Sequence, residues 1–120
     1  MRLDDLRRLL EAEVLTLHDP AEEEVVSACG SDMMSDVLAF VKDRAVLLTG
    51  LVNPQVIRTA MMMDMPCIVF VRGKHPSQDM IDLAEENRIT LMSVAGTMFE
   101  TCGRLYEAGL GHGERRDPCR

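Results

Sequence analysis

The sequence predicts an α/β protein, namely a three-layer α/β/α sandwich around a mostly parallel sheet of about five strands. Four short apolar runs follow one another along the chain, and each leads into a glycine-bearing turn and then into a stretch with helical periodicity. This alternation is typical of strand–helix–strand units, in which right-handed crossovers place the helices on the faces of the sheet. The expected strands are residues 24–28, 45–49, 67–71 and 90–94.

The N-terminal part adds one helix and one strand to this pattern. Residues 3–12 predict an amphipathic helix, because their leucines recur on one stripe and their charged residues lie elsewhere. The leucine-lined face needs a surface to cover it. Residues 13–17 alternate weakly and predict an edge strand, which ends before Pro20 because proline has no N–H for the ladder.

Local signals predict where the other helices begin and end. Asn53 followed by Pro54 is typical of a helix start, since the amide side chain caps the first turn and proline fits the first helical position. Thr97 and Glu100 have the spacing of a capping box, and Gly109 favours a helix end. The expected helices are residues 32–41, 54–64, 77–87 and 98–108.

The size and charge of the chain limit its organisation and its partners. Its 120 residues fit one domain, expected at residues 1–110 and followed by a polar tail, residues 111–120, that frays. A net charge of −7, no Trp and few other aromatic residues argue against binding to a nucleic acid polymer, which needs a basic surface and stacking platforms. No apolar run approaches the length of a membrane span or a signal peptide, so we expect a cytoplasmic protein.

Nothing in the sequence predicts catalysis or a metal site. The four cysteines form no CxxC pair, and the three histidines lie near no nucleophile motif. Cys29, beside a glycine at an expected helix start, is either a thiol of lowered pKa or, as is more common, a small buried hydrophobe. The methionines at residues 33–34 and 61–65 predict adaptable core filling, with one or two at a subunit contact.

The four glycine-bearing turns predict a ligand site. If the strands are parallel, the turns share the carboxyl edge of the sheet, where backbone amides and polar side chains can surround an anion. Arg72, Lys74 and His75 place three cations around Gly73, which makes this turn the best anion-binding candidate in an acidic protein. The expected ligand-binding residues are Gly30, Ser31, Asp32, Thr49, Gly50, Asn53, Arg72, Gly73, Lys74 and Thr97.

Each turn also has a purely structural interpretation. Ser31 or Asp32 can simply cap the following helix, and Asp32 would repel a phosphate unless a metal intervened. The turn at residues 49–54 can be a plain connection, and it lacks the lysine of a phosphate-binding P-loop. The basic turn at residues 72–75 can be a solvated surface loop.

Several segments resemble one known family. Residues 28–36, the Thr49–Gly50 turn, residues 68–73 and residues 83–97 are similar to the DRTGG domain. They resemble more closely the stand-alone DRTGG-like proteins encoded near iron-only hydrogenase genes, which are often labelled as related to HPr kinase. This resemblance implies a regulatory, non-catalytic α/β domain that associates in pairs. No kinase activity is implied, because the chain lacks the P-loop pattern.

These observations lead to two functional hypotheses. The first is a non-catalytic regulatory module that binds a small anionic metabolite or nucleotide at the carboxyl-edge turns and forms a homodimer. The second is a protein-interaction adaptor, associated with a hydrogenase or its assembly, that needs no small ligand. The first helix and the methionine-rich helix are the expected dimer surfaces. The sequence identifies no cofactor.

Overall fold

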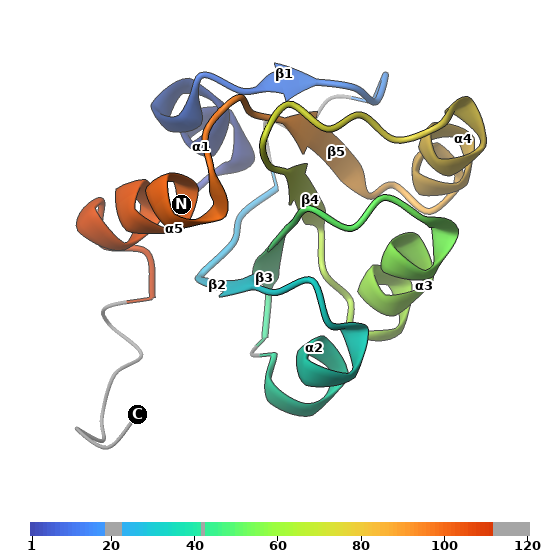
Figure 1. The fold of residues 1–120 in the computed structure, drawn as a ribbon, viewed down its shortest axis with the longest axis horizontal. Coiled ribbons are helices and arrows are strands. Elements are labelled where there is room, and N and C mark those ends of the chain that lie inside the picture. Colours follow the sequence, from blue (N-terminus) through green and yellow to red (C-terminus); the bar gives the residue numbers. More distant parts are fainter. Residues whose placement is uncertain (19–22, 42, 112–120) are drawn as a thin grey trace.

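The computed structural model describes residues 1–18, 23–41 and 43–111, which form a five-stranded sheet with helices on both faces (Figure 1). The strands are β1 (Glu13–Val14), β2 (Ser27–Gly30), β3 (Ala45–Thr49), β4 (Cys67–Phe70) and β5 (Thr90–Ser93). Their order across the sheet is β1-β5-β4-β3-β2. The last four in the chain are parallel, and β1 is antiparallel to β5. The predicted fold class is confirmed.

The helices divide between the two faces of this sheet. They are α1 (Leu3–Leu10), α2 (Met34–Phe40), α3 (Pro54–Met62), α4 (Gln78–Glu86) and α5 (Met98–Glu107). One core cluster joins α2, α3 and α4 to the sheet, and a second joins α1 and α5 to the opposite face (Figure 1). All five helices lie where the sequence predicts them, within a few residues at each end.

Burial on both faces explains why the central strands are continuous apolar runs. In β3 and β4 every residue is buried. Leu47 and Ile68 point toward α2, α3 and α4, whereas Leu48 and Val69 point toward α1 and α5. Because successive strand side chains alternate between faces, a sheet covered on both sides favours apolar residues at successive positions.

The apolar face of α1 is covered by the protein's own sheet. Leu3, Leu6 and Leu10 are buried in the cluster that includes Val46, Val69 and Met92. The prediction that this helix provides a dimer surface is therefore wrong for its leucine face, because the sheet already buries that face.

The position of β2 corrects the predicted strand at residues 24–28. The Val25 N–H donates to the Met1 carbonyl at 2.8 Å, and Glu24 pairs with Arg2, so this part of the run is held by the N-terminus. Pairing with β3 begins only at Ser27, and the strand extends to Gly30. The predicted turn at Cys29–Gly30 is wrong, because both residues belong to the strand.

Gly30 is explained by close packing of α5 on β2. A Cβ at Gly30 would lie 2.8 Å from Cys102 Sγ and 3.2 Å from Met98 Sδ, both on α5. Such approaches are shorter than van der Waals contact, so a side chain at this position would require the Cys102 and Met98 side chains to move, and glycine avoids this.

The segment after β1 is fastened to α4. The Leu15 N–H donates to the Leu91 carbonyl at 2.8 Å, and the Glu85 carboxylate accepts hydrogen bonds from the backbone N–H groups of Leu17 and His18 and from the His18 ring. Burial alone raises the pKa of Glu85, but these three donors outweigh it and hold the pKa below its usual value. The predicted edge strand is thus present but short, and Pro20 lies outside the described residues.

The methionines are divided between core and surface. Met34 and Met65 are buried and Met63 packs against the core, as predicted, whereas Met33, Met61 and Met62 are exposed. Among the described helices, none has the length and apolar character of a membrane span. Apart from Gly111, the predicted tail lies outside the described residues.

Substitution Gly30→Ala is expected to destabilise the protein by about 1–3 kcal/mol, because the added methyl group overlaps Cys102 Sγ and forces the side chains of α5 to repack against β2. Urea unfolding of purified variants measures this change. Gly103→Ala is the matched control: it lies within α5, where an added Cβ would meet nothing within 4 Å, so it should stabilise by about 0.5–1 kcal/mol. Equal stabilities of the two variants would contradict the packing argument.

Candidate functional site at the carboxyl edge

The turns after β2, β3, β4 and β5 all leave the sheet at one edge, because these strands are parallel. We call this the carboxyl edge, formed by residues 31–33, 50–53, 71–77 and 94–97. The helix after β4 lies on one face of the sheet and the helix after β5 lies on the other (Figure 1). Open α/β sheets place their ligands at such points.

Asp32 connects the turn after β2 to the turn after β3. Its Oδ1 accepts the Gly50 N–H at 2.7 Å and the Thr49 hydroxyl at 3.1 Å. The Thr49 side chain is fully buried, and its oxygen also accepts the Leu51 N–H at 3.1 Å. Asp32 therefore does not cap the helix that follows it, as one interpretation of the sequence proposed; it holds the neighbouring turn.

Arg72 lies against Gly50 from the other side. A Cβ at Gly50 would be 2.5 Å from Arg72 Nη2 and 3.5 Å from Asp32 Oδ1, so the absence of a side chain lets the guanidinium rest over the backbone. Arg72 is exposed, and no carboxylate among the described residues forms an ion pair with it. The carboxyl edge thus carries one positive and one negative group around a single glycine.

The backbone of the turn after β4 is bonded to the turn after β5. Arg72 and Gly73 both have left-handed φ values, 59° and 67°. The Arg72 N–H donates to the Gly96 carbonyl at 2.8 Å, and the Gly73 N–H donates to the Val94 carbonyl at 2.7 Å. Since the N–H groups of Gly50, Arg72 and Gly73 all have partners within the protein, recognition of an anion falls to side chains rather than to these amides.

The three cations predicted around Gly73 do not converge. The His75 ring is hydrogen-bonded to Glu13 of β1 at 3.1 Å and to the Gly73 carbonyl at 3.0 Å. The Glu13 carboxylate and the Gly73 carbonyl raise the pKa of His75 above its ordinary value. Lys74 is exposed, and Arg72 points to Gly50. His75 therefore fastens β1, and Arg72 and Lys74 remain as the cations of the edge.

Three other predicted residues have local roles as helix caps or turn bonds. Asn53 Oδ1 accepts the Gln55 N–H at 2.8 Å at the start of α3. Thr97 and Glu100 form the predicted capping box of α5, and hydrogen bonds from Thr97 lower the pKa of Glu100. Ser31 exchanges hydrogen bonds with the backbone of Met33. The predicted capping boundaries are confirmed, and these side chains lie outside the Asp32–Gly50–Arg72 group.

Of the described cysteines, Cys67 is buried, and Cys29 and Cys102 are half-buried. Burial raises the pKa values of Cys29, Cys67 and Cys102 above the ordinary thiol value. A thiolate at Cys29 is disfavoured, so the interpretation as a small hydrophobe is supported and the activated thiol is not. Among the described residues, no three His, Cys, Asp or Glu side chains gather as metal ligands.

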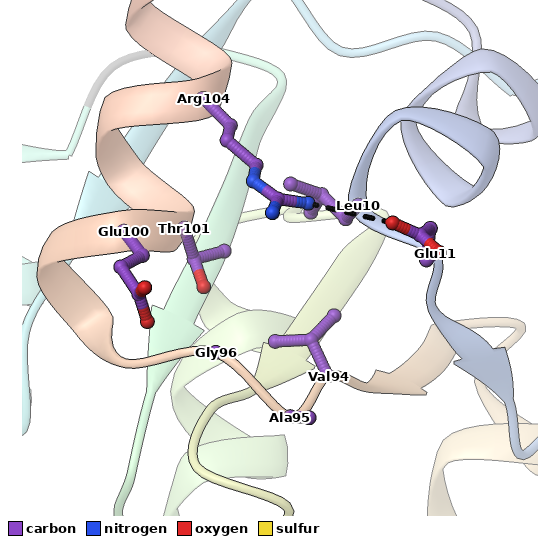
Figure 2. Close-up of a pocket in the computed structure, with 8 residues that line it drawn as sticks. All are labelled: Leu10, Glu11, Val94, Ala95, Gly96, Glu100, Thr101 and Arg104. Atoms are coloured by element: carbon purple, nitrogen blue, oxygen red, sulfur yellow. Dashed lines mark ion pairs between the residues drawn. The ribbon is translucent and has the colours of Figure 1, made fainter.

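A pocket of about 310 Å³ lies beside the carboxyl edge, between α1 and the start of α5 (Figure 2). Figure 2 shows the Arg104 side chain reaching from α5 toward Glu11 at the end of α1, and their charged groups are 3.9 Å apart. The residues that line the pocket include the apolar side chains of Leu10 and Val94 and the backbone of Gly96. Gly96 also accepts the Arg72 N–H, so the pocket adjoins the Asp32–Gly50–Arg72 group.

Sequence reasoning missed Glu11, Arg104 and the role of Gly96. Glu11 and Arg104 belong to different helices at opposite ends of the chain, and only their packing on one sheet face brings them together. The carbonyl of Gly96 has no sequence signal beyond its place in a turn that was recognised as glycine-bearing.

Comparison with known proteins identifies a family and a fold. The family model of the DRTGG domain matches residues 5–108. The chain is similar to a structure of the CBS and DRTGG domains of the regulatory region of Clostridium perfringens pyrophosphatase, complexed with its activator diadenosine tetraphosphate. The TM-score is 0.70 at 16% identity, over 97% of this chain and 50% of that one. The present chain thus spans about half of that structure, and the likeness establishes the fold. No curated protein matches the chain.

Replacing Asp32 tests its structural role. Asp32→Ala leaves the Gly50 N–H without its partner, so we expect a loss of about 1–3 kcal/mol of stability in urea unfolding. Asp32→Asn keeps an oxygen acceptor at the same place and should retain most of the stability. If the Ala and Asn variants were equally unstable, the hydrogen bonds to Oδ1 would not be the cause.

The contact between His75 and Glu13 predicts a pH dependence. Because the pKa of His75 is raised on folding, its contribution to stability is present below the unfolded value of about 6.5 and disappears as the pH rises through the folded value. Glu13→Gln should lower the pKa of His75 in an NMR titration and should destabilise the protein more at acidic than at alkaline pH. Glu107→Gln, on α5, serves as the control and should leave the His75 titration unchanged.

Proposed function

Since the chain belongs to the DRTGG domain family, we propose that it is a non-catalytic regulatory module that binds a small anionic metabolite or nucleotide at the carboxyl edge. The observation that carries this proposal is the exposed Arg72 guanidinium, which rests over Gly50 without an ion-pair partner among the described residues. In a chain with a net charge of −7, Arg72 and the neighbouring Lys74 form a local positive site. A guanidinium binds carboxylate and phosphate groups with two parallel hydrogen bonds.

The position of the predicted residues supports this site only in part. Asp32, Thr49, Gly50, Arg72 and Gly73 lie together at the edge, with Lys74 following them. Gly30 packs against α5 instead. The side chains of Ser31, Asn53 and Thr97 accept hydrogen bonds from backbone N–H groups two or three residues further along the chain. We therefore place ligand contact on Arg72, Lys74 and Asp32.

The arrangement around His18 does not favour an enzyme. The His18 ring bonds to Glu85 on one side and to the Thr90 hydroxyl at 3.1 Å on the other, which has the connectivity of a catalytic triad. Thr90, however, is fully buried and lies at the start of β5, away from the carboxyl edge. A substrate cannot reach its hydroxyl, so these bonds fasten the segment after β1 to α4.

The similar regulatory region supports a ligand of the nucleotide class. That structure is a complex with diadenosine tetraphosphate as activator, and it contains CBS domains as well as a DRTGG domain. Nucleotides carry the phosphate groups that Arg72 and Lys74 would bind. The comparison therefore supports nucleotides as a class of ligand and does not point to a particular nucleotide.

Exposed apolar side chains on the helices favour a second candidate, the interaction adaptor. Phe99 on α5 is 87% exposed and Met62 on α3 is 64% exposed. Such side chains suit contact with a second copy of the chain or with another protein, and the resemblance to stand-alone DRTGG-like proteins suggests a hydrogenase-related partner. Light scattering of the purified chain tests the homodimer.

Thermal unfolding with AMP tests the proposed function. Saturating AMP, about a hundredfold above its dissociation constant, should stabilise the protein by about 2.7 kcal/mol. The double substitution Arg72→Ala with Lys74→Ala should abolish this stabilisation. Arg58→Ala with Arg88→Ala removes the same charge from α3 and from the other end of the sheet, and should leave it intact. Unchanged stabilisation of the Arg72/Lys74 variant would refute the assignment.

A further inference from the structure

We propose that Asp32 accepts a hydrogen bond from a hydroxyl group of the ligand, so that the carboxyl edge selects a phosphate ester with a nearby free hydroxyl over a bare anion. The ribose phosphate portion of a nucleotide and a free sugar phosphate both have this chemistry. The inference deepens the proposed function and rests on it, because it concerns the same site.

The Asp32 carboxylate has one oxygen in use and one available. Oδ1 accepts the Gly50 N–H and the Thr49 hydroxyl, and no donor among the described residues reaches Oδ2. Asp32 is exposed, so a ligand can approach this second oxygen from solvent. The two bonds to Oδ1 hold the carboxylate in one orientation, which places Oδ2 in a defined position at the edge.

The charges around Gly50 work against a bare anion. Arg72 Nη2 and Asp32 Oδ1 lie 2.5 and 3.5 Å from the point that a Cβ on Gly50 would occupy, yet the two groups form no ion pair. An anion bound at Arg72 is attracted by the guanidinium, but it also meets the negative charge of Asp32 beside the same glycine, which opposes its binding. Lys74 adds attraction but is exposed to solvent, where such attraction is weak.

A hydroxyl group resolves this conflict. It is neutral, so it is not repelled, and it donates a strong hydrogen bond to an ionised carboxylate. A ligand that places phosphate on Arg72 and a hydroxyl on Oδ2 uses both groups that flank Gly50.

A divalent cation between Asp32 and phosphate is the competing explanation. Asp32 would be its protein carboxylate ligand, and no group of three or more His, Cys, Asp or Glu side chains gathers as metal ligands among the described residues. Magnesium is usually held by one or two carboxylates together with substrate phosphates, so this alternative makes binding dependent on the metal. Our proposal makes binding independent of it.

Asp32→Asn separates these possibilities. Asparagine keeps an oxygen for the Thr49 and Gly50 donors but replaces the second oxygen with an NH₂ group and removes the charge. Inorganic phosphate should then bind more tightly, because the repulsion is gone. The affinity of ribose 5-phosphate relative to that of inorganic phosphate should fall about tenfold, because the hydroxyl loses its charge-assisted hydrogen bond to Asp32. A tenfold change in affinity corresponds to about 1.4 kcal/mol.

The experiment is isothermal titration of the full chain with four probes, each with and without EDTA. The probes are AMP, 2′,3′-dideoxy-AMP, ribose 5-phosphate and inorganic phosphate. We expect AMP and ribose 5-phosphate to bind about tenfold more tightly than the other two, in EDTA as well, and to lose this preference in Asp32→Asn. Tighter binding of AMP than of ribose 5-phosphate would identify a nucleotide as the source of the ribose phosphate.

Two results would overturn the inference while leaving the proposed function in place. One is equal affinity for AMP and its dideoxy analogue, with binding still lost in the Arg72/Lys74 double variant. The other is loss of all binding in EDTA, which would assign Asp32 to a cation. If none of the four probes bound, the proposed function itself would fail.

Discussion

Because β3 pairs in parallel with both β2 and β4, and β4 pairs in parallel with β5, each connection must cross a face of the sheet and return to the same starting edge. The three right-handed crossovers place α2, α3 and α4 on one face, and α1 and α5 cover the other. For this reason the central strands are apolar except at Thr49, whose buried hydroxyl is hydrogen-bonded. All four turns at the carboxyl edge, and the group around Gly50, depend on this pairing.

Three backbone amides at the centre of this edge are used within the protein. The N–H groups of Gly50, Arg72 and Gly73 are bonded to Asp32, Gly96 and Val94, so the turns stabilise one another. Under the proposed function, recognition therefore falls to the charged side chains of Asp32, Arg72 and Lys74. A site of this kind distinguishes ligands by the combination of groups they present rather than by charge alone.

The turn after β4 connects the site to other parts of the fold. The Arg72 guanidinium lies against Gly50 in the turn after β3, and the Arg72 N–H donates to the Gly96 carbonyl in the turn after β5. The His75 ring is hydrogen-bonded to Glu13 of β1. The turn that carries Arg72 is thus in contact with the turns after β3 and β5 and with β1. Under the proposed function, a ligand on Arg72 would bind at this junction.

Strand–helix alternation, the Asn53–Pro54 start and the Thr97–Glu100 capping box are local patterns, so the sequence by itself determined the fold class and most element positions. It also identified the turns, since parallel strands share one edge. Only the tertiary structure decided that residues 24–25 pair with the N-terminus, that Gly30 serves α5 packing, and that Arg72 and His75 diverge. The physical reason is that these contacts join distant segments. Their partners depend on register and helix placement, which no local propensity encodes.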